Sequence, residues 1–237
     1  MGTSELNWAI VIQARMGSRR LPGKVLKPLY GKPLLERLFE RLAAVFDLER
    51  IILATTMRRE DDCLIAFARE KWIRFFRGSE SDLMDRYYQA ARWFGLETVA
   101  RVTADNPFVD AVELRNLLRL HAEKEAEYSH SLNEFGSHFP KGVGAEVFSK
   151  EGLSRVWRST YSPKDREHVN DYIHRYPAFF RTVLHKAPPK KYAPELSFTV
   201  DTMADFKRME SVFRALEKNG KPVSLEEAIF FARQRRR

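Results

Sequence analysis

Glycines and cationic side chains follow an apolar run near the start of the chain. Residues 8–12 have the length and β-branched content of a buried strand. The loop after this strand contains Gly17, Gly23, Arg15, Arg19, Arg20 and Lys24. Loops of this composition, placed after a buried strand, bind phosphate groups in α/β proteins. The pattern therefore predicts a polyphosphate-binding loop, and the alternative is a surface loop whose cations face water.

The spacing within this loop excludes two familiar phosphate motifs. Five residues separate Gly17 from Gly23, and Val25 follows Lys24. A P-loop has four residues between its glycines and a Ser or Thr after its lysine. No G-x-G-x-x-G pattern follows the strand, so the dinucleotide fingerprint is missing as well. The loop therefore predicts a phosphate site of another kind.

Two aspartates follow other predicted strands. Asp105 comes after the strand predicted at 98–103, and Asp201 comes directly after the one predicted at 196–200. Ligands bind at the carboxyl ends of strands in open α/β sheets, and Mg²⁺ takes one or two carboxylates together with phosphate oxygens. The two aspartates are therefore candidate Mg²⁺ ligands. The alternatives are turn formation for Asp105 and helix capping for Asp201.

Predicted strands and helices alternate over the first half of the chain. Short connections between them favour an α/β, Rossmann-like fold, with a mostly parallel sheet and helices on both of its faces. We expect one domain over residues 1–237, with a small antiparallel insertion roughly over 128–200. The predicted strands are 8–12, 50–56, 73–76, 98–103, 128–132, 144–149, 181–185 and 196–200, and the predicted helices are 33–46, 60–71, 82–94, 110–123, 150–158, 163–176, 202–217 and one from 224.

Composition and charge narrow the range of partners. The 237 residues carry a formal net charge of +9, and four of the cations lie in residues 233–237, a predicted basic tail. The remaining charge is spread along the chain and does not predict a nucleic-acid partner. No apolar run approaches the roughly 18 residues of a membrane span, so we expect no membrane partner. Cys63 is the only cysteine, which predicts a reducing, cytoplasmic location.

A family resemblance extends these inferences. Residues 13–24, QARMGSRRLPGK, closely resemble the signature Q-A-R-x-x-S-T-R-L-P-G-K of the sugar nucleotidyltransferases related to CMP-Kdo synthetase and acylneuraminate cytidylyltransferase. The spore-coat polysaccharide biosynthesis protein F family is the best match, and the chain departs from its pattern at Arg19. Further similar segments are RGSESDLMDRYYQAA at 77–91, VTADNP at 102–107, FPKGVGAEVFSKEGL at 139–153, SPKDREHVNDYIHRYP at 162–177 and TVDTMADF at 199–206.

The resemblance implies roles for individual residues. The implied nucleotide contacts are Ala14, Arg15, Gly17, Ser18, Arg20, Lys24, Ser79 and Asp105. The implied catalytic set is Arg15, Lys24, Asp105 and Asp201, with Mg²⁺ on the two aspartates, and the implied acceptor contacts are Glu146, Arg166 and His168. The sequence alone favours helix capping for Ser79 and a solvated helix position for Arg86. For Glu146 it favours a water-facing strand position at least as much as a substrate contact.

The activity implied by the resemblance is nucleotidyl transfer. An acidic sugar attacks a nucleoside triphosphate, which the resemblance suggests is CTP, and pyrophosphate leaves, in the synthesis of a polysaccharide or glycan precursor. Related cytidylyltransferases are commonly dimers, so the resemblance also suggests a homodimer. Two alternatives stay open. One is a glycosyltransferase of related fold, although the turn at Asp105 lacks the second Asp of a D-x-D motif, and the other is a catalytically silent nucleotide-binding protein.

Overall fold

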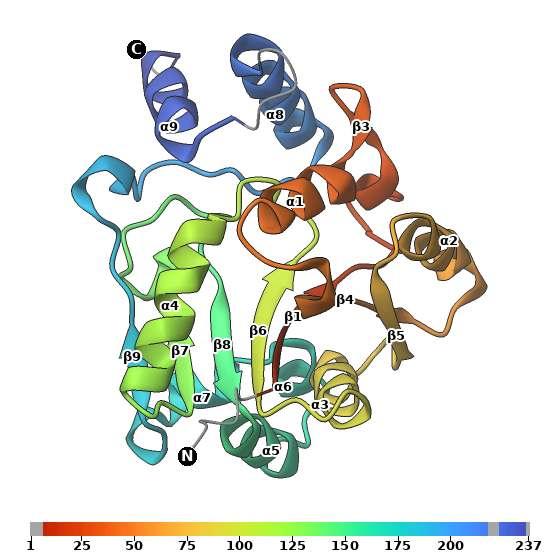
Figure 1. The fold of residues 1–237 in the computed structure, drawn as a ribbon, viewed down its shortest axis with the longest axis vertical. Helices are drawn as coiled ribbons and strands as arrows, with labels where there is room; N and C mark the ends of the chain where they lie inside the picture. Colours follow the sequence, from red (N-terminus) through yellow and green to blue (C-terminus); the bar gives the residue numbers. More distant parts are fainter. Residues whose placement is uncertain (1–6, 218–222, 236–237) are drawn as a thin grey trace.

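A seven-stranded sheet forms the centre of the molecule (Figure 1). The computed structural model describes residues 7–217 and 223–235. The strand order is β5-β4-β1-β6-β8-β7-β9. β8 alone runs antiparallel to its neighbours β6 and β7, and the other pairs are parallel. The strands are β1 (Trp8–Gln13), β4 (Ile51–Thr56), β5 (Arg74–Gly78), β6 (Thr98–Thr103), β7 (Tyr128–His130), β8 (Glu146–Ser149) and β9 (Thr182–Leu184).

Helices cover both faces of this sheet. On one face, α1, α2 and α4 pack their apolar side chains against β1, β4 and β6. On the other face, α3, α5 and α7 do the same, and α6 contacts α3. The helices are α1 (Leu34–Ala43), α2 (Asp62–Glu70), α3 (Leu83–Trp93), α4 (Ala111–Glu123), α5 (Lys150–Ser159), α6 (Pro163–Glu167), α7 (Asp171–Arg175), α8 (Met203–Leu216) and α9 (Leu225–Gln234). The predicted mostly parallel sheet with helices on both faces is therefore confirmed.

A separate apolar cluster joins α8 and α9 to the rest of the molecule. It includes Phe108, Phe198 and Phe213. In Figure 1, α8 and α9 lie beyond the end of the sheet toward which β6 points. Arg233, which we expected in a basic tail, lies in α9 and forms an ion pair with Glu195 at 2.9 Å. The last two arginines of that predicted tail lie outside the described residues.

Residues 128–200, where we expected a small antiparallel insertion, form one edge of the sheet and contain its antiparallel strand. They supply β7, β8 and β9, and β8 fits between β6 and β7, so this part of the chain completes the sheet. A second, two-stranded antiparallel sheet comes from β2 (Pro28–Leu29) and β3 (Lys32–Pro33), which the sequence analysis did not predict. The short 3₁₀ helices are η1 (Lys24–Leu26), η2 (Leu48–Arg50), η3 (Arg59–Asp61), η4 (Asn133–Phe135), η5 (Pro177–Phe179) and η6 (Pro189–Lys191).

Two predicted elements differ from the observed ones. The segment 196–200 is extended but is not a strand of the sheet, because its backbone bonds to two loops, at Lys141 and at Asp105. The helix predicted over 163–176 is broken into α6 and α7, with the buried Val169 packed in the gap between them. No helix in the described ranges is long and apolar enough to cross a membrane.

The order in which successive strands are added to the sheet changes direction at β1. From β1 it proceeds to β4 and β5 on one side, and then returns to place β6 on the other side of β1. The last residue of β1, Gln13, pairs with the last residue of β6, Thr103. The two strands therefore end at the same level, and the loops that follow them meet at a topological switch point, where open α/β sheets bind ligands.

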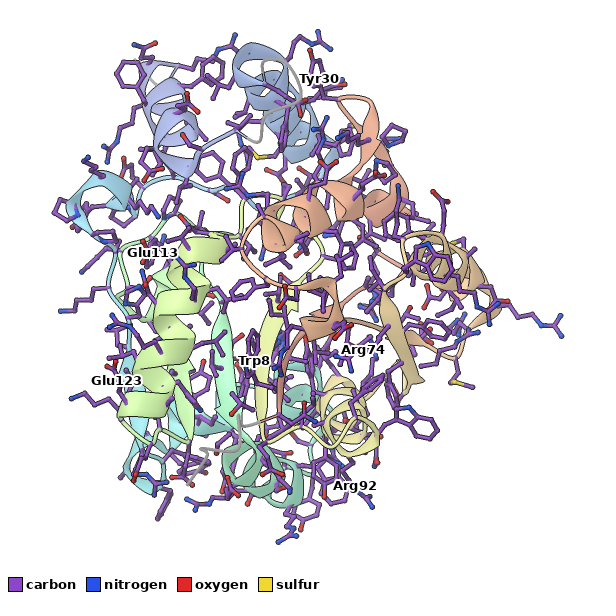
Figure 2. The ribbon with its side chains drawn as sticks, viewed as in Figure 1. Trp8, Tyr30, Arg74, Arg92, Glu113 and Glu123 are labelled. Atoms are coloured by element: carbon purple, nitrogen blue, oxygen red, sulfur yellow. The ribbon has the colours of Figure 1, made fainter. Side chains whose placement is uncertain are left out.

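A buried ionic cluster fixes the segment that leads from β9 toward α8. The ammonium group of Lys191 lies 2.7 Å from Asp110 Oδ2 and 2.9 Å from Glu113 Oε1. The other oxygen of Glu113 lies 2.8 Å from His185 Nε2. Because Asp110 is the N-cap of α4, this cluster ties the segment to one end of that helix. Figure 2 shows Glu113 at this end of α4 and Glu123 near the other.

Acid should weaken this cluster. Hydrogen bonds from His185 and then Lys191 lower the pKa of Glu113 to about 2 against the opposing effect of burial. The unfolded chain therefore takes up this proton at a higher pH than the folded protein does. The contribution of Glu113 to the free energy of unfolding is complete above the ordinary glutamate pKa and disappears as the pH falls toward 2.

Urea denaturation at a series of pH values measures this contribution. We expect Glu113→Gln to flatten the pH dependence of the free energy of unfolding between about pH 4.5 and pH 2. Glu123→Gln, at an exposed position on the same helix, serves as the control and should retain the wild-type slope. A Glu113→Gln protein with the wild-type slope would show that the cluster does not stabilise the fold.

Candidate nucleotide and metal site

Lys24 lies at the centre of the candidate site. Its side chain is 10% exposed. Its Nζ donates hydrogen bonds to Asp105 Oδ2 at 2.8 Å, the Val200 carbonyl at 2.8 Å and Asp201 Oδ1 at 3.2 Å. The structure thus brings together the lysine of the first loop and both candidate metal ligands. A single ammonium group joins three parts of the chain that are far apart in sequence.

The loop between β1 and Lys24 is held by hydrogen bonds within its own backbone and by Asp61, which lies just before α2. The Gly23 N–H donates to the Met16 carbonyl at 2.9 Å, and Gly23 has φ +69°, which favours glycine. The Met16 N–H donates to Asp61 Oδ1 at 2.7 Å. Asp61 is buried and also accepts a hydrogen bond from Thr56. Asp61 was missed by the sequence analysis, although its position shortly after β4 places it at the same edge of the sheet.

Asp105 and Asp201 are positioned by backbone contacts between their segments. The Val200 N–H donates to the Asp105 carbonyl at 2.9 Å, so the extended segment before Asp201 lies against the turn after β6. The Asp201 N–H donates to Asp205 Oδ2 at 3.2 Å, and Thr202 and Asp205 form a capping box at the start of α8. Although burial opposes it, hydrogen bonds from Thr202 hold the pKa of Asp205 at about 2. Asp201 thus leaves helix capping to Thr202 and Asp205, and its own side chain faces Lys24.

The two carboxylates fit Mg²⁺ in their chemistry. Asp105 and Asp201 both reach one point, now held by the Lys24 ammonium, and both are only partly buried. Within residues 7–217 and 223–235, no group of three or more His, Cys, Asp or Glu side chains could hold a metal ion. A Mg²⁺ ion at this point would have two carboxylate ligands, and phosphate oxygens and water would complete its coordination, as is common for Mg²⁺.

The other residues of the loop differ in whether their side chains contact this centre. Arg20 lies 2.8 Å from Asp201 Oδ1 in a mostly exposed ion pair. Arg15 and Arg19 are exposed and form no hydrogen bond or ion pair within the described part of the chain. The Ala14 N–H donates to Ala54 of β4, and the Ser18 N–H donates to Met16. The loop therefore presents cationic side chains that the protein itself does not neutralise.

Gly17 lies beside an acidic pair. A Cβ atom at Gly17 would come within 2.9 Å of Glu60 Oε1, and Glu80 lies next to it at 4.0 Å. Arg58 forms ion pairs with Glu60 and Glu80, at 3.6 and 3.0 Å. A side chain at this position would require the Glu60 carboxylate, which is the end of a flexible and partly exposed side chain, to move.

Ser79, for which the sequence favours helix capping, lies in the turn before α3 and is not the N-cap of that helix. Its Oγ accepts a hydrogen bond from the Asp82 N–H at 3.1 Å, and Asp82 is the N-cap of α3. The interpretation of Arg86 as a solvated residue was wrong: it is 3% exposed, and its guanidinium donates to the carbonyls of Ser79 and Glu80. Burial lowers the pKa of Arg86. A contact from Ser79 to a nucleotide stays a prediction.

Glu146 is part of a buried polar row across the α3 face of the sheet. It pairs in register with Arg101 of β6, which forms an ion pair with it, and its other oxygen accepts a hydrogen bond from Tyr128 at 2.8 Å. Gln13 extends the row, because its Oε1 accepts from Arg101 at 3.1 Å and from Tyr87 at 3.0 Å. The expectation of a water-facing Glu146 was wrong, because the carboxylate is buried and both of its oxygens already have protein partners.

The other two predicted acceptor residues lie around the break between α6 and α7. Arg166 forms an ion pair with Asp82 at 3.1 Å and donates to the Trp157 carbonyl. His168 is exposed. No contact joins either residue to Lys24, Asp105 or Asp201 in the described structure. The acceptor roles of Glu146, Arg166 and His168 therefore stay predictions.

Comparison with known proteins agrees with this architecture. The spore coat polysaccharide biosynthesis protein SpsF of Bacillus subtilis (strain 168) is 34% identical over 209 residues, which cover 86% of this chain and 85% of that protein. A cytidylyltransferase structure from Leptospira borgpetersenii superimposes with a TM-score of 0.90 at 26% identity, over 98% of this chain and 96% of the other. CMP:2-keto-3-deoxy-manno-octonic acid synthetase, solved with CTP, shares the fold, with a TM-score of 0.65 at 18% identity over 88% of this chain and 99% of the other.

The extent of these matches assigns the chain to a family. A family model described as cytidylyltransferase matches residues 9–234, so it includes both the cationic loop and the two aspartates. The resemblance inferred from short motifs is thereby confirmed along nearly the whole chain. The protein belongs to the cytidylyltransferase family.

Proposed function

We propose that this protein is a Mg²⁺-dependent cytidylyltransferase that transfers CMP from CTP to a hydroxyl group of an acidic sugar and releases pyrophosphate. The observation that carries the proposal is the meeting of Asp105 and Asp201 at Lys24, beside the cationic loop. Membership of the family supports the transfer and the base, and a protein of the same fold was solved with CTP. SpsF is named for polysaccharide biosynthesis, and we propose the same kind of pathway here.

In this proposal, the cationic loop binds the triphosphate. Arg15 is exposed and lacks a protein partner among the described residues, so its guanidinium is available to phosphate oxygens. Lys24 forms an ion pair with Asp105, and Arg20 forms one with Asp201. As the bond between the α-phosphorus and the leaving oxygen breaks, negative charge accumulates on pyrophosphate. Preorganised cations stabilise this charge, and each such contact is typically worth about 3 kcal/mol in the transition state.

The two aspartates would hold the metal ion. Asp105 and Asp201 supply carboxylate oxygens, and Lys24 keeps the two side chains close together before the nucleotide binds. Bound Mg²⁺ would neutralise phosphate charge and help to orient the triphosphate. The acceptor hydroxyl attacks the α-phosphorus in line with the departing pyrophosphate.

The acceptor contacts form the less constrained part of the proposal. His168 is exposed and Arg166 is only partly buried, so both are available to a sugar carboxylate. Glu146 would act indirectly, since its carboxylate orients Arg101 and Tyr128. A cytoplasmic location and a homodimer remain part of the proposal as predictions.

Replacing either candidate metal ligand should abolish turnover. We expect Asp105→Asn and Asp201→Asn each to lower the rate of pyrophosphate release by at least about 100-fold, because an amide is a weaker ligand and leaves the phosphate charge uncompensated. The measurement is a coupled pyrophosphate assay with CTP, Mg²⁺ and an acidic sugar. Asp47→Asn, at an exposed aspartate before β4, is the matched control. Wild-type rates in both site variants would refute the metal assignment.

Nucleotide binding can be tested without knowledge of the acceptor. CTP with Mg²⁺, at about 100 times its dissociation constant, should stabilise the protein by about 2.7 kcal/mol and raise its melting temperature by several degrees. EDTA should remove most of this shift, and so should Lys24→Met. The other nucleoside triphosphates should give smaller shifts. An equal shift in EDTA would exclude a metal-dependent mode of binding.

A further inference from the structure

Two tryptophans lie exposed on one shallow surface, which we call the tryptophan face. Trp72 is 89% exposed and Trp93 is 76% exposed. The other residues of this surface are Arg69, Ile73, Arg74, Phe75 and Phe94. Neither indole N–H has a hydrogen-bond partner within residues 7–217 and 223–235. Exposed apolar surface of this kind marks an interaction site more often than chance placement does.

Trp72 takes a left-handed backbone position at the end of α2, as Glu125 does at the end of α4. α2 ends in a Schellman motif, in which the Ile73 N–H donates to Ala68 at 2.8 Å and the Trp72 N–H donates to Arg69 at 3.2 Å. Trp72 therefore takes the left-handed position, with φ +56°, and α3 ends in the same motif with Gly95 at φ +63°. Glycine takes this conformation without strain, whereas a side chain does not. The chain thus places an exposed tryptophan where glycine would be more stable.

The charge of the tryptophan face is positive. Arg69 lies 5.6 Å from the ring centre of Phe75, and Arg74 lies 5.1 Å from that of Phe94. In the described part of the chain, neither arginine forms an ion pair. Glu70 lies 3.6 Å from Lys71. Arg74 donates a hydrogen bond to the Glu49 carbonyl, and the Glu49 carboxylate attracts it without forming an ion pair. Figure 2 shows Arg74 beside β5. A second copy of this chain would bring the same cations into contact and repel, so the complementary partner is anionic.

We propose that the tryptophan face binds the surface of an anionic lipid bilayer. Indole rings combine an apolar body with one N–H donor, and they favour the headgroup region of a bilayer for this reason. Arginines near the surface gain energy from anionic headgroups. A shallow, open surface matches the broad plane of a bilayer better than it matches a small ligand. The sequence analysis expected no membrane partner, because it found no apolar run long enough to span a membrane.

The position of the face is compatible with catalysis at a bilayer. Trp72 directly precedes β5 and Trp93 lies shortly before β6, so both lie at the amino ends of the strands. The Lys24 site lies at the carboxyl ends of β1 and β6. A bilayer on the tryptophan face therefore leaves the nucleotide site accessible from the solvent.

The test is sedimentation of the whole protein with vesicles. Vesicles of equal parts phosphatidylglycerol and phosphatidylcholine should bind the wild-type protein and shift its tryptophan emission to the blue, and vesicles of phosphatidylcholine alone should bind it far more weakly. Trp72→Ala and Trp93→Ala should each lower the affinity about tenfold. Arg69→Gln and Arg74→Gln should each lower it about fivefold.

A second substitution at Trp72 separates binding from folding. Trp72→Gly should raise the melting temperature by about 2–4 °C, because it relieves the left-handed strain, and should still lose vesicle binding. Tyr161→Ala, at an aromatic residue that is 87% exposed elsewhere, and Lys207→Gln on α8 are the matched controls and should bind like the wild type. All of these variants should release pyrophosphate at the wild-type rate in solution.

Three results would overturn the proposal. The first is wild-type vesicle binding by both alanine variants, and the second is equal binding to the two kinds of vesicle. The third is a concentration-dependent dimer that Trp72→Ala converts to a monomer, since the face would then be a contact between copies. A lack of pyrophosphate release by the wild-type protein would bear only on the proposed activity, because the vesicle measurements do not depend on turnover.

Discussion

The ammonium group of Lys24 is the constraint on which the candidate site depends. A buried cation is stable only with charged or polar partners around it, and Lys24 finds them in Asp105, Asp201 and the carbonyl of Val200. The two aspartates lie 81 and 177 residues away in the sequence. One side chain therefore requires the first loop, the turn after β6 and the segment before α8 to meet. The site exists only when the whole sheet and the C-terminal helices are in place.

Hydrogen bonds and close backbone packing hold in place the parts of the chain that meet at Lys24. Asp61 holds the cationic loop through the Met16 N–H. The segment before Asp201 lies against Asp105, and Gly142 allows it to pass, because a Cβ there would come within 2.5 Å of Thr199. These contacts hold the backbone of the loop, while the side chains of Arg15 and Arg19 have no protein partner in the described structure. Preorganisation of this kind lowers the cost of binding a highly charged ligand.

The two ends of the sheet have different chemistry. At the carboxyl ends of β1 and β6, the carboxylates of Asp105 and Asp201 lie beside cationic side chains. At the amino ends, indole rings and arginines are exposed and carry no ion pair in the described structure. In a βαβ arrangement each helix returns the chain to the amino end of the next strand, so substitutions at the helix C-termini can build a surface without disturbing the site.

The sequence by itself determined the class of fold, the cationic loop and the identity of the two aspartates. These features are local: apolar periodicity reports strands and helices, and the loop lies directly after its strand. Predictions from the sequence were wrong where residues far away in the chain supply the hydrogen bonds of a segment. The extended segment before Asp201 has the composition of a strand, but loops rather than the sheet supply its hydrogen bonds.

Tertiary structure alone decided which charged side chains are buried and what they contact. Sequence neighbours predict that Glu146 and Arg86 face water, but both are buried. Glu146 forms an ion pair with Arg101. Arg86 donates hydrogen bonds to the carbonyls of Ser79 and Glu80. Asp61 carries no motif, and its importance comes only from its contact with the loop at Met16. The physical reason is that burial and pairing of a charge depend on residues that folding brings from elsewhere in the chain, and no local pattern records them.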